Sequence, residues 1–127
     1  MLAGQETSSN TLSFALYELA RQPHYQDRLR AEIRAMEHTV HERGGVTFTS
    51  SDFDSMPFLQ AFVREVLRYH PAVPHNYRQA MKDDVLPLSK PIRTLSGKII
   101  NEIPIPKGTR LTLSVAAYNR HVFFAML

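Results

Sequence analysis

The chain opens with MLAGQETSSNTL, residues 1–12, and runs directly into SFALYELA, residues 13–20. Four apolar residues in this stretch recur at the spacing of one helical face: Leu12, Ala15, Leu16 and Leu19. This spacing predicts a helix with one buried apolar stripe. The residues before the stripe have low helix propensity. Gly4 costs about 1 kcal/mol relative to Ala in a helix, and Thr, Ser and Asn are mediocre helix formers. A helix with such a flank indicates a functional site built into a rigid element.

The composition of the 127 residues narrows the class of protein. The net charge is +3, but fifteen Lys and Arg are interspersed with twelve Asp and Glu, so we expect a mixed solvated surface and no nucleic-acid partner. No run approaches the roughly 20 apolar residues of a membrane span, and no targeting segment is visible, so we expect no membrane segment in this chain. There is no cysteine, which excludes disulfides, Cys-based metal sites and thiolate ligation within these residues.

Prolines and glycines divide the chain into elements. Pro23 predicts that the first helix ends near Gln22 and that a second, amphipathic packing helix follows and closes at residues 44–45. Residues 47–52 form a connection that ends in good N-cap residues and leads into a short turn at 53–56. Pro57 opens a third major helix, from Phe58 to about His70. Its apolar face consists of Leu59, Phe62, Val63, Val66 and Leu67.

We predict mainly extended structure for the last third of the chain. An irregular rigid segment is predicted from Pro71 through Arg78, and a polar link at 82–84. Residues 98–103 and 109–115 are predicted to form two short strands on either side of a turn at 104–108. The predicted fold class is therefore mainly α with a small β portion.

Three pairs of polar residues are candidates for chemistry, each with a plainer interpretation. Glu65 and Arg68 are neighbours on a helix and form either a surface ion pair or a partly buried one with further hydrogen bonds. Glu6 and Thr7 are either a surface acid beside a hydroxyl bonded to the preceding turn, or an acid–alcohol pair that opens the helix and relays protons. The pair His38 and His41 has metal-ligand spacing but lacks further ligands, so we interpret the histidines as surface residues and expect no metal site.

Four motifs follow one another along the chain. They are AGQETS at 3–8, EVLR at 65–68, RYHPAVP at 68–74 with Arg78 after it, and IPKGT at 105–109 followed by YNRH at 118–121. In this order and spacing they resemble the oxygen-activation helix, the E-x-x-R helix and the following segments of the haem-thiolate monooxygenases, the cytochrome P-450 superfamily. The resemblance covers about residues 1–121, as one partial domain from the middle-to-late portion of a family member, and leaves 122–127 unmatched.

The resemblance implies a role for individual residues. Ala3 and Gly4 would lie against the distal face of a haem, and Glu6 with Thr7 would help to deliver protons to bound dioxygen. Glu65 and Arg68 would form a structural ion pair, and Arg78 would contact a haem propionate. Val73, Pro74 and Tyr77 would line the substrate pocket.

The resemblance also implies what the whole protein does. The parent would be a membrane-associated enzyme of the endoplasmic-reticulum type that inserts one oxygen atom into a small apolar organic substrate, with electrons from an NADPH-dependent reductase. This family binds haem iron through a Cys thiolate, which is absent from these residues. We therefore expect the chain to be a fragment that is inactive by itself. The alternative is a non-catalytic helical remnant that binds a partner protein through exposed apolar faces.

Overall fold

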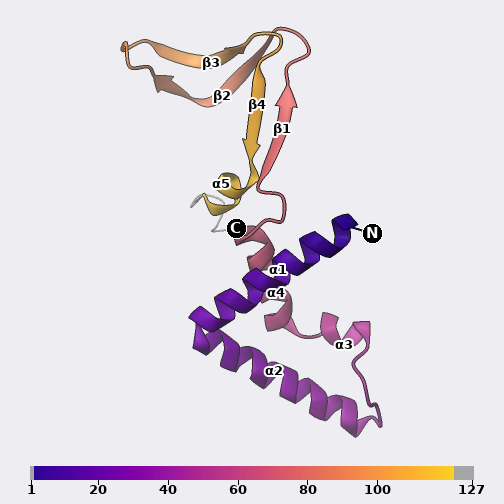
Figure 1. The fold of residues 1–127 in the computed structure, drawn as a ribbon. Coiled ribbons are helices and arrows are strands. Elements are labelled where there is room, and N and C mark those ends of the chain that lie inside the picture. The colour runs from indigo at the N-terminus through magenta and orange to yellow at the C-terminus, as the bar shows by residue number, and fades with distance from the viewer. Residues whose placement is uncertain (1, 122–127) are drawn as a thin grey trace. The chain divides into compact units, whose positions relative to one another are not determined.

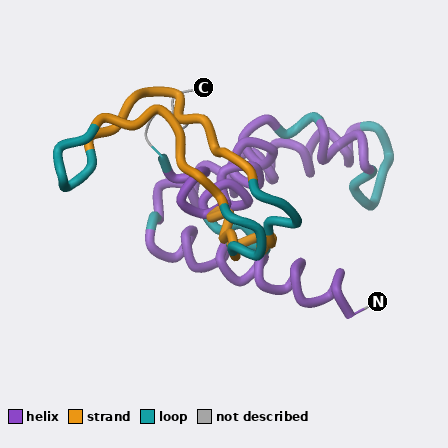
Figure 2. Tube along the Cα trace, turned by 90° about the horizontal axis from the view of Figure 1, so that it is seen from above, coloured by secondary structure: helices purple, strands orange, loops and turns teal. Residues whose placement is uncertain are grey.

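The computed structural model describes residues 2–121, and the tail predicted to be unmatched, residues 122–127, lies outside the described part. About 53% of the described residues are helical and 23% are in strands, which confirms the fold class. Figure 1 shows the elements in order and Figure 2 separates the helices from the strands. The described residues divide into two compact units: a helical unit of residues 2–74 and 116–121, and a strand unit of residues 75–115.

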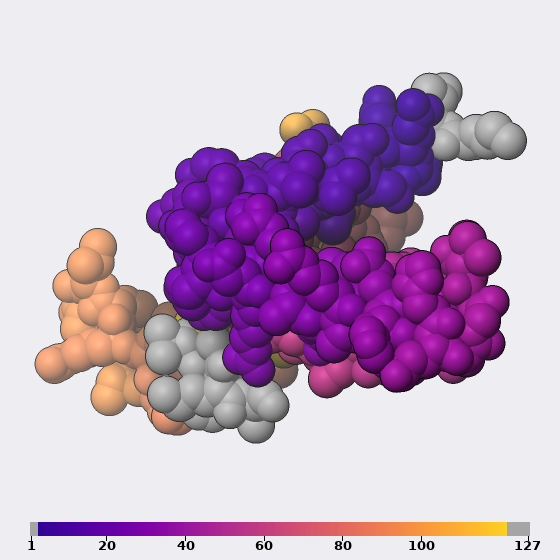
Figure 3. Space-filling model, turned by 90° about the horizontal axis from the view of Figure 1, so that it is seen from below, coloured from indigo at the N-terminus to yellow at the C-terminus, as the bar shows by residue number. Residues whose placement is uncertain are grey.

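The helical unit begins with two long helices joined at a single residue. Helix α1 (Leu2–Arg21) and helix α2 (Pro23–Glu42) meet at Gln22, as predicted from Pro23 at the start of the second helix. Figure 3 shows them meeting at one end and diverging from it. Helix α2 ends where the glycines stand: Gly44 N–H donates to the His41 carbonyl and Gly45 N–H to the Val40 carbonyl, both at 2.9 Å. Gly44 adopts φ +76°, which a glycine accommodates without strain.

Helix α3 (Ser50–Asp54) is short and begins with a capping box. The Asp52 carboxylate accepts hydrogen bonds from both the N–H and the hydroxyl of Thr49, each at 2.7 Å. Arg43, just past the end of α2, forms an ion pair with the same carboxylate. Asp52 is buried, and the guanidinium of Arg43, followed by the donors of Thr49, holds the pKa of its carboxyl far below the usual range.

Helix α4 (Pro57–Tyr69) is capped by a residue from another helix. Its N-cap residue, Met56, makes no side-chain capping bond, and Pro57 has no N–H to satisfy. The two carboxylate oxygens of Glu32 on α2 accept the next two free N–H groups, those of Phe58 and Leu59, each at 2.8 Å. One carboxylate thus satisfies two donors of the first turn and places a negative charge at the helix N-terminus.

The core of the helical unit is small. Among the described residues the buried apolar side chains are Val40, Met56 and Val66. The predicted burial of the α1 stripe is wrong for two of its members, because Leu12 is 61% exposed and Leu16 is 59% exposed. The physical reason is that α1 contacts α2 and α4 along only part of its surface.

Helix α5 (Val115–Arg120), which the sequence analysis did not predict, is fastened to the end of α4 by two arginines. The guanidinium of Arg68 on α4 donates to the carbonyl of Asn119 on α5. In the other direction, Arg120 Nε donates to the carbonyl of Tyr69 at 2.8 Å, and its guanidinium lies 4.5 Å from the centre of the Tyr69 ring. Each helix therefore supplies a cation to a carbonyl of the other.

The strand unit contains four strands where two were predicted. Strand β1 (His75–Gln79) pairs antiparallel with β4 (Arg110–Ser114), from His75 opposite Ser114 to Gln79 opposite Arg110. Strand β2 (Asp84–Arg93) pairs antiparallel with β3 (Ile99–Ile105). The predicted turn begins later than expected, because β3 continues to Ile105 and the bend lies at 106–109 with Gly108 at φ +86°. Strand β2 was missed because Pro87 and Pro91 and a register shift interrupt its pattern.

Candidate functional site

The candidate oxygen-activation turn, Ala3–Ser8, lies in the first two turns of α1. Ala3 and Gly4 are exposed, and a Cβ atom added to Gly4 would meet nothing within 4 Å. The backbone here is therefore open to the close approach of a flat molecule. Glu6 is exposed beside it, whereas Thr7 is half-buried.

Of the two interpretations of Glu6 and Thr7, the structure does not show a local opening of the helix, because α1 is continuous from Leu2 to Arg21. The Thr7 hydroxyl donates to the carbonyl of Ala3 at 2.9 Å and lies 3.4 Å from that of Gly4. Thr11 and Ser13 bond in the same way to carbonyls one turn earlier, at 2.9 and 2.8 Å. A carbonyl oxygen has two lone pairs, so a hydroxyl can share it with the helical N–H and the helix stays intact.

A pocket of about 480 Å³ lies between this part of α1 and α4. On the α1 side it is lined by Thr7, Ser8, Thr11, Leu12 and Ala15, and on the other side by Val63, Val66, Leu67 and Ala72. The hydroxyl groups of the wall all come from the α1 side, and the other side is aliphatic. The half-buried residue Thr7 therefore lines a concave surface.

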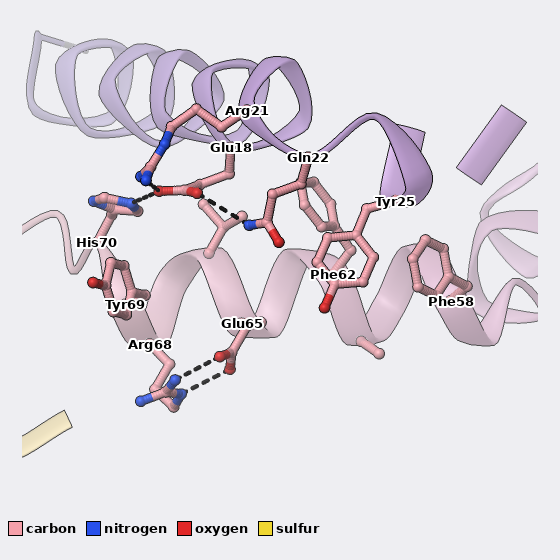
Figure 4. A pocket seen from close by; sticks show the side chains of 12 residues that line it. Glu18, Arg21, Gln22, Tyr25, Phe58, Phe62, Glu65, Arg68, Tyr69 and His70 are labelled. Carbon is pink, nitrogen blue, oxygen red and sulfur yellow. Dashed lines mark hydrogen bonds and ion pairs between the residues drawn. The ribbon is translucent and has the colours of Figure 1, made fainter. Parts of the chain in front are cut away.

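Glu65 and Arg68 form the predicted ion pair with two parallel hydrogen bonds (Figure 4). Arg68 Nε reaches Glu65 Oε2 at 2.7 Å, and Nη2 reaches Oε1. The Arg68 side chain is 30% exposed, but that of Glu65 is 60% exposed, so the pair is buried on one side only. Arg68 holds the pKa of the Glu65 carboxyl below its usual value despite an opposing effect of burial.

A nearly buried histidine was missed by the sequence analysis. His70 Nε2 lies 2.9 Å from Glu18 Oε1, and these side chains are only 11% and 14% exposed. The imidazole also stacks on the ring of Phe14, with centroids 4.3 Å apart and planes at 7°. The hydrogen bond with His70 is the main reason that the pKa of Glu18 is lowered. The contact ties the end of α4 to α1, and its partners lie 52 positions apart, too far for helical spacing to reveal.

The same pair forms part of the wall of a larger groove of about 620 Å³ (Figure 4). One side of the groove is the end of α1 and the start of α2, including Glu18 and Tyr25, and the other is α4. His38, by contrast, is a surface residue as predicted, with its side chain 3.5 Å from Glu42 and largely exposed. Among residues 2–121 no three His, Cys, Asp or Glu side chains gather as a metal site would require.

The residues expected at the substrate and propionate positions are exposed. Val73 and Pro74 follow α4 in the helical unit, and Pro74 lines a small pocket with Phe14 and His70. Tyr77 and Arg78 lie on β1 in the strand unit. Arg78 Nη1 donates to the carbonyl of Tyr77 at 2.8 Å, which leaves most of its guanidinium donors available.

The order of these pieces, from a glycine-bearing helix to the Glu65–Arg68 pair and the strands after it, is that of a known family. The family model for cytochrome P450 matches residues 1–124. The chain belongs to the cytochrome P-450 family.

Curated relatives and solved structures agree with this assignment. A ganoderic acid synthetase of Ganoderma lucidum is 40% identical over 119 residues, which are 94% of this chain and 21% of that protein. The cytochrome P-450 monooxygenase 91 of Postia placenta is 40% identical over 121 residues, 95% of this chain and 21% of the relative. The crystal structure of a mutant cytochrome P-450DA haem domain is similar with a TM-score of 0.67 at 26% identity, over 91% of this chain and 21% of that one.

This cytochrome P-450 chain spans about a fifth of the length of the curated relatives that it matches. None of the helices in the described residues is both long and apolar enough to cross a membrane.

Proposed function

We propose that residues 1–121 are part of one cytochrome P-450 domain and that the turn Ala3–Thr7 forms one wall of its haem site. The observation that carries this proposal is the bare backbone at Gly4, where no side chain would hold a flat ring away from the helix. Residues 3–8 fit one face of a haem in this respect. A thiolate ligand of the kind that the family uses would have to be supplied by residues other than these 127, because they contain no cysteine.

When bound, the haem supplies the redox chemistry that inserts one oxygen atom of dioxygen into a small apolar organic substrate. We assign to Thr7 and Glu6 the delivery of protons. The Thr7 hydroxyl donates its proton to the Ala3 carbonyl, and its lone pairs remain free to accept a proton from water or from an acid. Glu6 is exposed next to it and can exchange protons with solvent.

The remaining residues are assigned to support and binding. Glu65 and Arg68 hold the end of α4 against α5, since Arg68 bridges the carboxylate and the Asn119 carbonyl. We assign Arg78 to a haem propionate, and Val73, Pro74 and Tyr77 to the substrate pocket. For the whole protein we propose an NADPH-dependent reductase as electron donor and a membrane of the endoplasmic-reticulum type as its location. The comparisons give the alternative, a partner-binding module, no support.

The first experiment tests the chain by itself. After titration with haemin and reduction, the carbon-monoxide difference spectrum should lack the Soret band of a thiolate-ligated haem, because no cysteine is present. A thiolate-type band from the purified 127-residue chain would overturn the proposal that the ligand lies elsewhere.

The second experiment tests the role of the turn. Residues 1–121 replace the matching segment of the Ganoderma lucidum relative, which retains its own remaining sequence. We expect a thiolate-type spectrum, and we expect Thr7→Ala to lower product formed per dioxygen consumed, whereas Thr7→Ser retains the hydroxyl and the yield. Equal yields from the two variants would refute the proton-delivery role.

A further inference from the structure

The turn that joins β2 to β3, residues 94–98, holds a serine in an exposed position (Figure 1). Thr94 N–H donates to the Lys98 carbonyl at 2.8 Å, and Gly97 N–H donates to the Thr94 carbonyl at 2.9 Å. Gly97 adopts φ +85°, which a glycine accommodates without strain. The turn is therefore closed by backbone hydrogen bonds that do not use the side chain of Ser96, so this side chain can change while the turn persists.

The hydroxyl oxygen of Ser96 keeps lone pairs for a reaction. The Thr94 hydroxyl donates its only proton to the Lys98 carbonyl at 3.0 Å. The Ser96 hydroxyl lies 2.9 Å from the Thr94 hydroxyl and is therefore the donor of that hydrogen bond. Because a hydroxyl oxygen has two lone pairs in addition to its proton, the Ser96 oxygen can act as a nucleophile from the exposed side of the turn.

The charged residues around this serine are all cationic. Residues 90–99 contain Lys90, Arg93 and Lys98 and no acidic residue. Arg93 Nε donates to the Gly97 carbonyl at 3.3 Å, so the guanidinium is held against the turn. The planar fork of a guanidinium suits a phosphate group, which it binds through two parallel hydrogen bonds. The turn therefore combines an exposed hydroxyl with a neighbouring cation that suits a phosphate.

The end of the hairpin that carries the turn can open without disturbing the rest of the ladder. The register of β2 and β3 shifts between Pro87 and Ile92. Between this shift and the turn the ladder consists of two residue pairs, Ile92 with Ile100 and Arg93 with Ile99. The side chains of Ile92 and Ile99 are 45% and 66% exposed. A short and exposed section of a two-stranded ladder opens at a low cost in free energy, so an enzyme can bind it in an extended conformation.

We propose that Ser96 is a phosphorylation site for a protein kinase that selects cationic residues ahead of a serine. Lys90 and Arg93 precede Ser96, and acidic groups on such a kinase recognise them by their charge. The Ser96 oxygen forms a bond to the γ-phosphorus of ATP, the bond from that phosphorus to the ADP oxygen breaks, and the hydroxyl proton passes to the catalytic aspartate of the kinase. This inference goes beyond the proposed oxygen chemistry and does not depend on it.

Phosphorylation changes the charge of the turn and adds contacts to it. A phosphoserine carries about −1.5 to −2 charges at neutral pH, so the three cations of residues 90–99 are largely neutralised. Arg93 and Lys98, which flank the turn, donate charge-assisted hydrogen bonds to the phosphate oxygens. The modified turn is therefore less cationic and is held closed more firmly than the unmodified one.

Phosphate transfer tests the proposal on the complete 127-residue chain. The chain is incubated with ATP and a calmodulin-dependent protein kinase, which selects an arginine ahead of a serine, and the modified residue is located by mass spectrometry. We expect Ser96 to be the main site and Ser96→Ala to abolish the main product. Arg93→Gln should lower kcat/KM about tenfold or more, because a hydrogen bond to a charged group is lost. An unchanged chain that accepts no phosphate at Ser96 would overturn the proposal.

Two controls separate selection by Arg93 from a general effect of charge. Lys98→Gln removes an equal charge from the other side of Ser96 and should leave kcat/KM nearly unchanged. Ser51 is equally exposed but is followed by Asp52, so the same kinase should not modify it. Equal losses for Arg93→Gln and Lys98→Gln would overturn the proposed selection, as would modification of Ser51 as fast as that of Ser96.

Phosphorus NMR tests the contacts of the phosphate independently of the kinase. A phosphoserine loses its second proton with a pKa near about 6, and neighbouring cations stabilise the dianion. The titration midpoint of phosphorylated Ser96 should therefore be lower in the folded chain than in the same chain unfolded in urea, and Lys98→Gln should reduce this difference. Equal midpoints in the folded and unfolded chains would refute the contacts with Arg93 and Lys98.

Discussion

Replacing Glu32 should destabilise the helical unit even though Glu32 lies on α2 and the affected helix is α4. The carboxylate accepts the N–H groups of Phe58 and Leu59 at 2.8 Å each, and Met56 provides no side-chain cap of its own. Loss of one capping acceptor costs about 1 kcal/mol, so two cost about 2 kcal/mol. The lost charge at the helix N-terminus adds about 0.3–1 kcal/mol. Glu32→Ala should therefore lower the free energy of unfolding by about 2–3 kcal/mol.

The assay is urea unfolding followed by far-ultraviolet circular dichroism, with Glu37→Ala as the matched control. Glu37 is exposed on the same helix, so its loss should change stability by less than about 0.5 kcal/mol. Glu32→Gln keeps one acceptor oxygen and should fall between the two. Equal unfolding midpoints for Glu32→Ala and Glu37→Ala would refute the reasoning that a carboxylate from α2 caps α4.

Three further predictions concern the other polar contacts. Because the pKa of Asp52 is lowered in the folded state, its contribution to stability is complete at neutral pH and is lost as the pH falls below about 5. In acid titrations followed by circular dichroism, Asp52→Asn should therefore make the loss of stability with falling pH less steep. An equally steep loss in the variant would contradict this role of Asp52. His70→Ala should cost about 1–3 kcal/mol in urea unfolding, from the lost hydrogen bond and ring stacking, whereas His38→Ala should be neutral. Arg68→Ala should lower the thermal midpoint by an amount equivalent to about 1–3 kcal/mol, which is less than the cost of breaking a fully buried pair. The control Arg64→Ala, on the same helix, should leave the thermal midpoint unchanged. A cost above about 4 kcal/mol for Arg68→Ala would show that the pair is buried in solution.

The helical boundaries could be predicted because the signals that set them are local. Pro23 and Pro57 open helices at their own positions, and Gly44 lies in the turn directly after α2. The family could be predicted for a related reason: its motifs are short and follow one another in a set order. The roles of Thr7 and Arg78, by contrast, come from the resemblance and remain predictions.

The features that the sequence did not reveal depend on partners far along the chain. Strand β1 forms because residues near position 112 pair with it, and α5 is fastened to α4 across about fifty residues. In the sequence, Glu32 looks like an ordinary surface acid of an amphipathic helix. Only the structure shows that the first turn of α4 lies beside it. The exposure of Leu12 and Leu16 follows the same principle, since spacing shows which side chains share a face but not whether another element covers that face.

The fastening of α5 to α4 makes the strand unit an insertion. The Pro74 carbonyl accepts a hydrogen bond from Ala116 N–H at 3.2 Å, so the chain leaves the helical unit and returns to it at one point. The residues between Pro74 and Ala116 therefore form a loop whose two ends are held together by this hydrogen bond. The entropic cost of closing such a loop grows only with the logarithm of its length. The helical unit can therefore tolerate lengthened, shortened or exchanged hairpins in residues 75–115 while its helices keep their register. Sequence change in such a protein can accumulate in the inserted segment without disturbing the helices that carry it.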